Sequence, residues 1–581
     1  MRFKVSKPEE QFYPVEPFND FREMLLNSRR KWGAHPAFME KVDNEWRSTT
    51  FNKLFYAVMS LGCGLRTLGM NRQMNVAFAS ENRIRWCISY LAVACGNAVC
   101  VPIDKELKSQ EFFHILYTTQ TEIFIGSQKY VDMVLEMIGS LPRLRHIINM
   151  DDRAENSMVL KFTDILHEGS QLFDKDASDY PYTVIEPDLP ACILFTSGTT
   201  GTSKGVMLSQ TNIITDLHAM LKVIPIRHPE VFLSVLPLHH TYECTCGFLG
   251  PVSHGMTVAF AENLKRIPDN LQEVRATIML GVPLLYDAIY RKIMERIAEK
   301  GMTKFRIGRG IASFTERLFH KNIRRQVFKA LHERFGGRLR LLISGGAAIS
   351  PDITRGLREL GLTVVQGYGL TETSPVITLN RIDNFKDDSA GLPVPNAEFK
   401  IDAGEICVRG PMVMLGYYNN PEATAEVIVD GWFHTGDLGY IDEDGFLFIQ
   451  GRKKAVIVTA NGKNVYPEEI EYQLNRSPFI LESLVWEGPD AHKYCEEVHA
   501  IIVPDITYFD QYLAKQGKKI SEHEVEEILK QEVRKQCGRL ANYKRVQRFT
   551  VQWEEFEKTT TRKIKRYLYT SKIRPVSGKH D

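Results

Sequence analysis

The segment 196–205 combines residue types that can hold a chain of phosphates. It reads Thr-Ser-Gly-Thr-Thr-Gly-Thr-Ser-Lys-Gly and directly follows an apolar run, 191–195, that is typical of a buried strand. Its hydroxyls, backbone N–H groups and one ammonium group suit polyphosphate oxygens. It is not a Walker-type loop, because Ser203 stands where that motif needs glycine. A flexible linker is the alternative, but Ser209 is expected to cap a helix beginning at Gln210, so the segment lies within a domain.

A second segment, 366–373, reads Gln-Gly-Tyr-Gly-Leu-Thr-Glu-Thr and places an aromatic ring between two glycines. At the end of a strand, Tyr368 can offer a flat face to a purine. The carboxylate of Glu372 is a hard oxygen ligand of the kind that Mg²⁺ prefers. Taken alone, the tyrosine would be read as a core residue and the glutamate as a solvated charge.

In their order along nearly the whole chain, these segments resemble the signatures of the adenylate-forming superfamily. That superfamily contains acyl-CoA synthetases, adenylation domains of peptide synthetases and luciferases. The resemblance implies that Tyr368 stacks on adenine and that Thr371 contacts the α-phosphate. It also implies that Glu372 binds Mg²⁺, with Thr196 of the phosphate loop as a second metal ligand.

Two shorter segments extend the resemblance. Gly345 and Gly346, followed by Ala347, resemble the stretch that lets adenine and the acyl group approach the backbone, which paired glycines permit. Asp437 resembles the residue that holds the ribose hydroxyls and Arg452 its basic partner, although a tight turn would also explain such residues. The implied ATP- and coenzyme A-binding residues are Thr196, Ser197, Gly198, Thr199, Thr200, Gly201, Thr202, Lys204, Gly345, Gly346, Ala347, Gln366, Gly367, Tyr368, Gly369, Asp437, Arg452 and Gly462.

Two further segments separate this superfamily from other ATP-using enzymes. Residues 451–454, Gly-Arg-Lys-Lys, resemble the hinge between its two domains, with Lys454 as the pivot of the rotation. Residues 558–564 resemble its C-terminal signature, which makes Lys563 the catalytic lysine. Glu557 replaces the usual proline and Arg562 the usual glycine of that signature. The alternative is an exposed basic tail, which leaves a peripheral membrane contact open.

The implied reaction activates a carboxylate with ATP to an acyl-AMP, releases pyrophosphate and then forms an acyl-CoA thioester. Mg²⁺ on Glu372 and the ammonium of Lys563 would reduce the repulsion between the two anionic substrates. Domain rotation would then bring in segment 460–465, where Gly462 allows the pantetheine arm of coenzyme A to pass. We therefore expect ATP, Mg²⁺ and coenzyme A as cofactors and a small carboxylate as substrate.

Residues 236–243, Leu-Pro-Leu-His-His-Thr-Tyr-Glu, resemble a variant found among long-chain fatty acyl-CoA synthetases, as do residues 410–418. This predicts a fatty acid:CoA ligase with His240 at the mouth of the acyl site. The neighbouring histidines have no evident third ligand for a metal. Alternatives are an aryl acid, an amino acid whose ammonium Glu243 would hold, a carrier-protein thiol as acceptor, or a nucleotide-binding regulator without turnover.

The elements that position these residues are those of an α/β protein. The 581 residues are 44% hydrophobic and 25% charged, as in ordinary globular chains, and a net charge of +2 gives no field that would recruit nucleic acid. Strand-length apolar runs alternate with helical patterns to about residue 450, which predicts layered α/β subdomains with parallel sheets. From about 391 short strands with Gly, Asp and Asn turns predict a small β subdomain, and an αβ pattern returns after Pro467.

We therefore expect a large N-terminal domain over 1–452, with a β-rich subdomain at about 391–452, and a small mobile α+β domain over 453–581. The longest apolar stretch, 87–103, is too short and too interrupted to span a bilayer. The N-terminus lacks the apolar core of a signal peptide. Ten scattered cysteines indicate reduced thiols, so a cytoplasmic location is expected.

Overall fold

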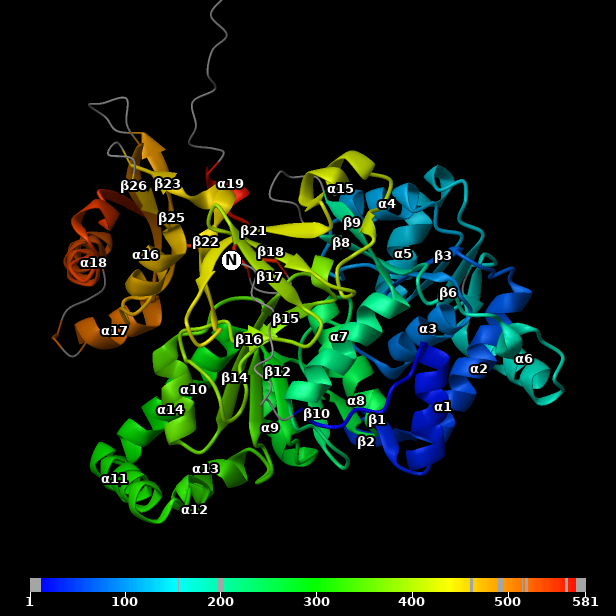
Figure 1. The fold of residues 1–581 in the computed structure, drawn as a ribbon, viewed down its shortest axis with the longest axis horizontal. Helices are drawn as coiled ribbons and strands as arrows, with labels where there is room; N and C mark the ends of the chain where they lie inside the picture. Colours follow the sequence, from blue (N-terminus) through cyan, green and yellow to red (C-terminus); the bar gives the residue numbers. More distant parts are fainter. Residues whose placement is uncertain are drawn as a thin grey trace, which may run out of the picture.

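The structure is a computed structural model, and it describes residues 12–154, 156–196, 203–459, 463–489, 496–514, 516–517, 521–559 and 563–570. A large α/β domain makes up most of the molecule. A smaller domain from the C-terminal part of the chain, orange and red in Figure 1, stands to one side of it. The expected α/β class, with a large N-terminal and a smaller C-terminal domain, is confirmed.

The first large sheet carries the phosphate loop near one edge. From β8 to β7 its neighbouring strands run parallel, whereas β9 is antiparallel to β8 and β19 is antiparallel to β9. Segment 197–202, between β8 and β9, lies outside the described residues. The strands in spatial order are β19 (Gly416–Tyr417), β9 (Lys204–Ser209), β8 (Pro190–Thr196), β4 (Val99–Pro102), β3 (Asn75–Ala79), β5 (Ile123–Gly126), β6 (His146–Asn149) and β7 (Val159–Lys161).

The second large sheet carries the other segments that are expected to bind the nucleotide. Its central strands, from β1 to β14, are parallel, and register places Ser344 of β13 beside Gln366 of β14. Neighbouring parallel strands end at one edge, so Gly345 and Gly367 emerge there together. In spatial order the strands are β16 (Leu392–Pro393), β15 (Val376–Leu379), β14 (Thr363–Gly369), β13 (Leu341–Ser344), β12 (Ile278–Gly281), β10 (Val231–Ser234), β11 (Thr257–Phe260), β1 (Pro36–Val42) and β2 (Glu45–Thr50).

Aromatic side chains connect the two sheets. Phe78 of β3 meets Trp86 at 5.2 Å between ring centroids, and Phe248 meets Trp86 at 6.2 Å and Phe38 of β1 at 5.9 Å. All four are buried in one hydrophobic core that includes residues of both sheets. The helices of this domain are α1 (Phe21–Trp32), α2 (Phe51–Thr67), α3 (Ile84–Cys95), α4 (Ser109–Thr118), α5 (Gln128–Met137), α6 (Phe162–Asp174), α7 (Gln210–Val223), the π-helix η3 (Tyr242–Leu249), α8 (Gly250–Ser253), α9 (Ile267–Glu273), α10 (Pro283–Lys300), α11 (Met302–Phe319), α12 (Arg324–Val327), α13 (Lys329–Arg334) and α14 (Pro351–Glu359).

A small antiparallel sheet and the C-terminal domain follow. The small sheet consists of β17 (Glu398–Asp402), β18 (Glu405–Arg409), β20 (Ile428–Val429), β21 (Trp432–Ile441) and β22 (Leu447–Arg452), with α15 (Pro421–Val427) beside it. A separate hydrophobic core begins at Ile457. It lies among β23 (Ile457–Val458), β24 (Asn464–Val465), β25 (Ile480–Pro489), β26 (Glu496–Pro504), β27 (Arg548–Val551), α16 (Pro467–Leu474), α17 (Ile506–Ala514) and α18 (Glu522–Cys537), and α19 (Tyr567–Thr570) follows.

Local sequence signals account for several element boundaries. The expected cap of α7 is confirmed: the Ser209 hydroxyl accepts from the Asn212 N–H at 3.0 Å, and the Asn212 side chain accepts from the Ser209 N–H at 2.8 Å. Strand β10 ends at Ser234, although the apolar run that begins at Val231 continues to Leu238. Pro237 has no N–H to donate to a neighbouring strand and so disfavours its continuation.

Candidate active site

The end of strand β14 and the middle of strand β21 meet at Tyr368 and Asp437. The Tyr368 hydroxyl donates to Asp437 Oδ2 at 2.6 Å, and Arg452 Nε lies 2.8 Å from Asp437 Oδ1. Asp437 and Arg452 are directly paired across β21 and β22. Burial raises the pKa of Asp437, which is only 4% exposed, and the Arg452 charge opposes that shift. Three residues expected to hold the adenosine part of ATP therefore form one polar cluster.

Glu372 lies beside the phosphate loop. It follows β14 in the single turn η5 (Thr371–Thr373). The Tyr417 hydroxyl donates to Glu372 Oε1 at 3.0 Å, and Lys204 Nζ lies 4.8 Å from the centre of the Tyr417 ring. Thr196, the last residue of β8, is paired with Lys204, the first residue of β9, so the two ends of the phosphate loop lie side by side. Ser197, Gly198, Thr199, Thr200, Gly201 and Thr202 lie outside the described residues.

The paired glycines follow β13 at the same sheet edge. Gly345 is buried, and a Cβ there would lie 2.9 Å from the ring of Tyr242. Gly346 has a φ of +82°, a conformation that favours glycine. Gly346 and Ala347 are exposed, so their backbone is open to a ligand. The Tyr242 contact was not foreseen, because nothing local links residue 242 to this turn.

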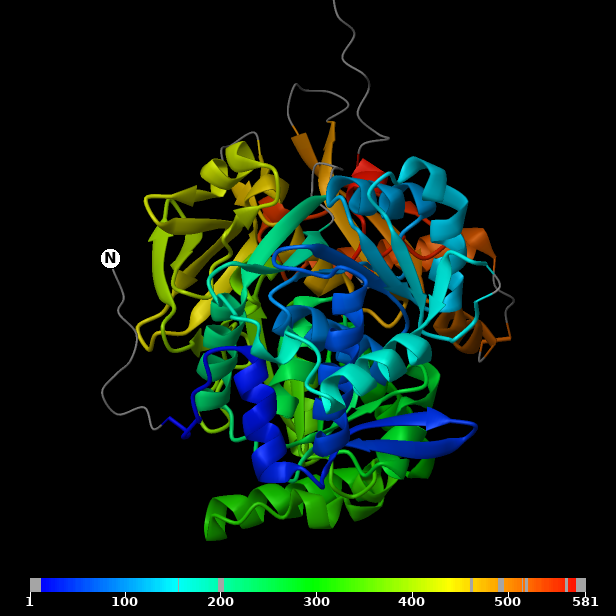
Figure 2. The ribbon, with the colours of Figure 1, turned by 90° about the vertical axis from the view of Figure 1, so that its right-hand side faces the viewer.

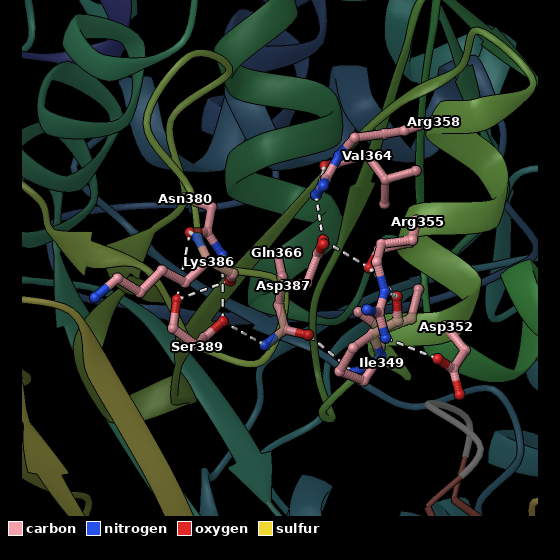
Figure 3. A network of polar contacts seen from close by, with 12 residues as sticks. Ile349, Asp352, Arg355, Arg358, Val364, Gln366, Asn380, Lys386, Asp387 and Ser389 are labelled. Atoms are coloured by element: carbon pink, nitrogen blue, oxygen red, sulfur yellow. Dashed lines mark hydrogen bonds and ion pairs between the residues drawn. The ribbon is translucent and has the colours of Figure 1, made fainter. Parts of the chain in front are cut away.

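The Gln366 side chain links strand β14 to the neighbouring segments around Ile349 and Ser389 (Figure 3). Its side chain donates to the Ser389 carbonyl at 3.0 Å and accepts from the Ile349 N–H at 2.8 Å. The nucleotide contact expected of Gln366 stays a prediction, and the structure assigns its side chain to the scaffold. Gly369 is needed for close packing, since a Cβ there would lie 1.6 Å from the Pro375 carbonyl oxygen. Gly367 is similarly close, at 2.9 Å, to the Leu379 side chain.

Lys563 reaches this site from the C-terminal domain. It belongs to a hairpin in which Lys558 bridges Ile564, and its N–H donates to the Thr559 hydroxyl at 3.2 Å. Crowding by protein atoms lowers the pKa of Lys563 and the Arg452 charge adds to this effect, while the Asp437 and Glu372 carboxylates oppose it. The lysine therefore lies within the field of the residues expected to hold ATP.

The histidine pair of segment 236–243 acquires an acidic neighbour. His239 Nε2 lies 3.3 Å from Asp104 Oδ1, and the ligand atoms of Asp104, His239 and His240 all fall within 4.8 Å of one another. A third potential metal ligand, the Asp104 carboxylate, thus lies beside the two histidines, contrary to the sequence interpretation. Burial lowers the pKa of His240, and the charges of His239 and Lys563 add to the shift. The same positive charge of Lys563 would oppose a bound cation, which favours a hydrogen-bonded Asp–His pair.

Glu243 is enclosed in the π-helix η3 and is 1% exposed. Among the described residues neither of its oxygens has a hydrogen-bond partner of ordinary geometry. Burial raises the pKa of Glu243 to about 8, and the nearby Ser234 hydroxyl opposes this shift. At pH 7 this carboxyl is therefore mostly neutral, so it is not a ready anion for a substrate ammonium.

The expected hinge lies immediately beyond the ribose-site residues. Lys453 Nζ lies 2.9 Å from Glu405 Oε2, whereas the Lys454 side chain is exposed. A Cβ on Gly451 would lie 2.8 Å from Glu468 Oε2 of the C-terminal domain, so the two domains touch here. The pivot role of Lys454 stays a prediction, and Gly462 lies outside the described residues.

A family model for AMP-binding enzymes matches residues 26–418, more than half of the chain. The chain belongs to the AMP-binding enzyme family. The resemblance to adenylate-forming enzymes is thus confirmed, whereas the roles of the individual site residues stay predictions. Among the described residues, no helix has both the length and the apolar character needed to cross a bilayer.

Relatives of this AMP-binding enzyme include acid-thiol ligases. It is 30% identical over 490 residues to the long-chain-fatty-acid–CoA ligase FadD15 of Mycobacterium bovis, covering 81% of each chain. It is 27% identical to the Arabidopsis thaliana long-chain-fatty-acid–[acyl-carrier-protein] ligase AEE15, covering 83% of this chain and 76% of that protein. The structure of the anthranilate CoA ligase AuaEII superposes with a TM-score of 0.74 at 20% identity, over 97% of this chain and 98% of that one, which shows the shared fold.

Proposed function

We propose that this protein is an ATP-dependent fatty acid:CoA ligase. The carboxylate attacks the α-phosphate of ATP, pyrophosphate leaves, and the coenzyme A thiol then displaces AMP from the acyl-AMP carbonyl. The observation that carries the proposal is the buried Asp437 carboxylate held by Tyr368 and Arg452, with Lys563 of the C-terminal domain within electrostatic range of Asp437 and of Glu372. A mobile cation beside two fixed carboxylates suits a reaction in which anions must be brought together and then released.

The described residues supply the nucleotide contacts of the first step. Asp437, fixed by Tyr368 and Arg452, would accept from the ribose hydroxyls. Lys204 at the end of the phosphate loop and Lys563 would hold phosphate oxygens, and Thr371 would donate to the α-phosphate. This arrangement holds the reacting groups close together, which is the main requirement of phosphoryl chemistry.

The donor set also fits Mg²⁺. Glu372 offers a carboxylate oriented by the Tyr417 hydroxyl, and Thr196 at the end of β8 offers a hydroxyl, both hard oxygen ligands. Bound there, Mg²⁺ would neutralise part of the phosphate charge. The Tyr417 hydroxyl fixes the Glu372 side chain, so orientation of this carboxylate is the contribution of the chain itself.

Thioester formation needs the C-terminal domain to rotate, and the charged contacts between the domains are weak. Arg476 pairs with Asp352 at 3.0 Å and Arg291 with Asp505 at 3.3 Å, both in partly exposed positions. Such pairs contribute ~0–1 kcal/mol each. Rotation about Lys454 would withdraw Lys563 and admit coenzyme A.

The acyl chain is proposed to enter beside His239 and η3. A cavity there, with a volume of about 10 Å³, is lined mostly by apolar side chains. This is room for roughly one water molecule, so an acyl chain must displace side chains to enter. The lining residues are Tyr90, Pro102, Cys192, Leu194, Leu208, Ile213, Leu238, His239, Thr241, Cys244 and Thr245. With buried free thiols at the nine described cysteines, a cytoplasmic location accompanies the proposal.

An aryl acid substrate is the second candidate, because the fold is shared with an anthranilate CoA ligase. An amino acid is disfavoured by the neutral state of Glu243 near pH 7. Pyrophosphate release with Mg-ATP should be measured for fatty acids from C2 to C18, each with and without coenzyme A. The proposal is supported if pyrophosphate is released only with fatty acids of one range of chain lengths and if coenzyme A increases that release several-fold. Release only with anthranilate or benzoate selects the aryl alternative, and release stimulated only by acyl carrier protein selects that acceptor.

A further inference from the structure

Helix α11 presents a row of apolar side chains to solvent. Ile307, Ile311, Phe314 and Leu318 are 58%, 52%, 64% and 58% exposed. They are spaced four, three and four residues apart, so they share one face of the helix. We call these four residues the α11 stripe. Figure 1 places α11 at the lower left edge of the molecule, below the C-terminal domain, with α10 and α14 between them.

The opposite face of α11 is the one that holds the helix to the protein. Ala312 is fully buried there, and Phe305 meets Phe328 at 5.7 Å between ring centroids. A Cβ on Gly308 would lie 3.0 Å from the Val327 side chain. The stripe is therefore not a core face left open by loose packing. In Figure 2 the green helices of this region likewise form the lower border of the molecule.

The surroundings of the stripe are strongly basic. Residues 302–329 contain eight Lys or Arg and one acidic residue, Glu316, although the whole chain has a net charge of only +2. At 100° per residue, Arg306 and Arg317 fall on one flank of the stripe and Lys304 on the other. All three are exposed. An apolar face bordered by cations on both sides is typical of a helix that lies in a membrane interface.

We propose that the α11 stripe docks this protein on an anionic membrane surface. The stripe would enter the boundary between headgroups and acyl chains, and the flanking cations would meet lipid phosphates. A second copy of this chain fits poorly, since a two-fold contact would set two strongly basic faces against each other. If the proposed function holds, docking also places the ligase where long-chain carboxylates accumulate.

The basic C-terminal segment is a weaker candidate for this contact. Lys558 pairs with Glu482 and with Glu555, and Arg566 pairs with Glu471 at 2.7 Å. Lys563 lies within electrostatic range of Asp437 and Glu372. These cations are engaged within the protein, whereas Arg306 and Arg317 border an open apolar face.

Sedimentation with vesicles tests the proposal on the full chain. Wild-type protein should bind vesicles of phosphatidylcholine with ~30% phosphatidylglycerol. It should bind much less to vesicles of phosphatidylcholine alone, and much less to either kind of vesicle at high salt. The double variant Phe314→Ser/Leu318→Ser should reduce the bound fraction at least ~5-fold. Arg306→Gln/Arg317→Gln should reduce it and weaken the salt dependence.

The control variant is Lys175→Gln/Val184→Ser, at exposed positions away from α11, and it should bind vesicles like wild type. The proposal would be overturned if the control lost as much vesicle binding as the stripe variant, or if wild-type protein did not bind vesicles. It would also be overturned if wild-type protein bound polyglutamate, an anionic polymer without lipid, but not the vesicles. Pyrophosphate release with a dispersed C8 acid should be unchanged in the stripe variant. Failure of docking and failure of the ligase proposal are thereby read from different assays.

Discussion

Tyr368 and Asp437 share a 2.6 Å hydrogen bond between the end of β14 and the middle of β21. This contact joins the second large sheet to the small antiparallel sheet at the place expected to hold adenosine. Because Asp437 is buried, the Tyr368 hydroxyl and the Arg452 guanidinium together keep its carboxylate in one orientation.

Replacing Tyr368 by phenylalanine keeps the ring and removes this hydrogen bond. We expect the KM for ATP to rise at least about 5-fold, since a hydrogen bond to a charged acceptor is worth ~1.5–3 kcal/mol. Steady-state kinetics at saturating carboxylate measure this. Tyr440→Phe, at an exposed position on β21, is the matched control. An unchanged KM for ATP would mean that the bond does not position the ribose-binding carboxylate.

Lys563→Ala should lose at least ~10²-fold in pyrophosphate release, because one preorganised charge donor is removed. It should still convert supplied acyl-AMP to acyl-CoA, since the lysine acts only in the first step. The two half-reactions are assayed separately, with Lys565→Ala as control. Equal loss in both half-reactions would contradict alternation of the two domains.

Lys454→Pro should show the reverse pattern. Proline fixes φ and removes an N–H, so the backbone rotation proposed at this residue would be blocked. Adenylation should persist while thioester formation slows at least ~10-fold. Lys454→Ala removes the same side chain without that restriction and should resemble wild type. Normal coenzyme A turnover by the proline variant would show that the pivot lies elsewhere.

Glu243 should make stability depend on pH. Its folded-state pKa is about 8, above the ordinary 4.5, so between these values the unfolded chain releases a proton that the folded chain keeps. The contribution of Glu243 to the free energy of unfolding therefore falls as pH rises from 4.5 to 8. Glu243→Gln removes this dependence. The Tm of the variant minus the Tm of wild type should therefore be about 2–4 °C larger at pH 8 than at pH 5. The prediction would be contradicted if this Tm difference did not change with pH, or if the variant Glu422→Gln, at an exposed position, showed the same change.

Local segments could be predicted from the sequence, and contacts between distant segments could not. The strand before the phosphate loop, the cap of α7 and the glycine-flanked Tyr368 each depend on a few neighbouring residues. The Asp104–His239 and Tyr417–Glu372 contacts join segments far apart in the chain. They become visible only when the packing of the sheets is known.

The π-helix η3 is a similar case. A motif comparison marks His240 and Glu243 but says nothing about the wide helix that begins at Tyr242 and includes Glu243. Such turns are rare and often lie at functional sites. Here the turn buries Glu243, and a Cβ on Gly247 would lie 2.7 Å from its carboxyl carbon. The charge state of that carboxyl follows from this packing, which the residue types alone did not indicate.

The aromatic contacts from Phe78 through Trp86 and Phe248 to Phe38 have a consequence for dissecting the protein. They belong to a core shared by both large sheets, and each sheet also contributes to a separate core of its own, so separating the sheets would expose the shared layer. A fragment that ends before η3 would leave Trp86 without Phe248 and would be prone to aggregate. Calorimetry should accordingly find one cooperative transition for the two sheets together, and expression of either half alone should yield insoluble protein.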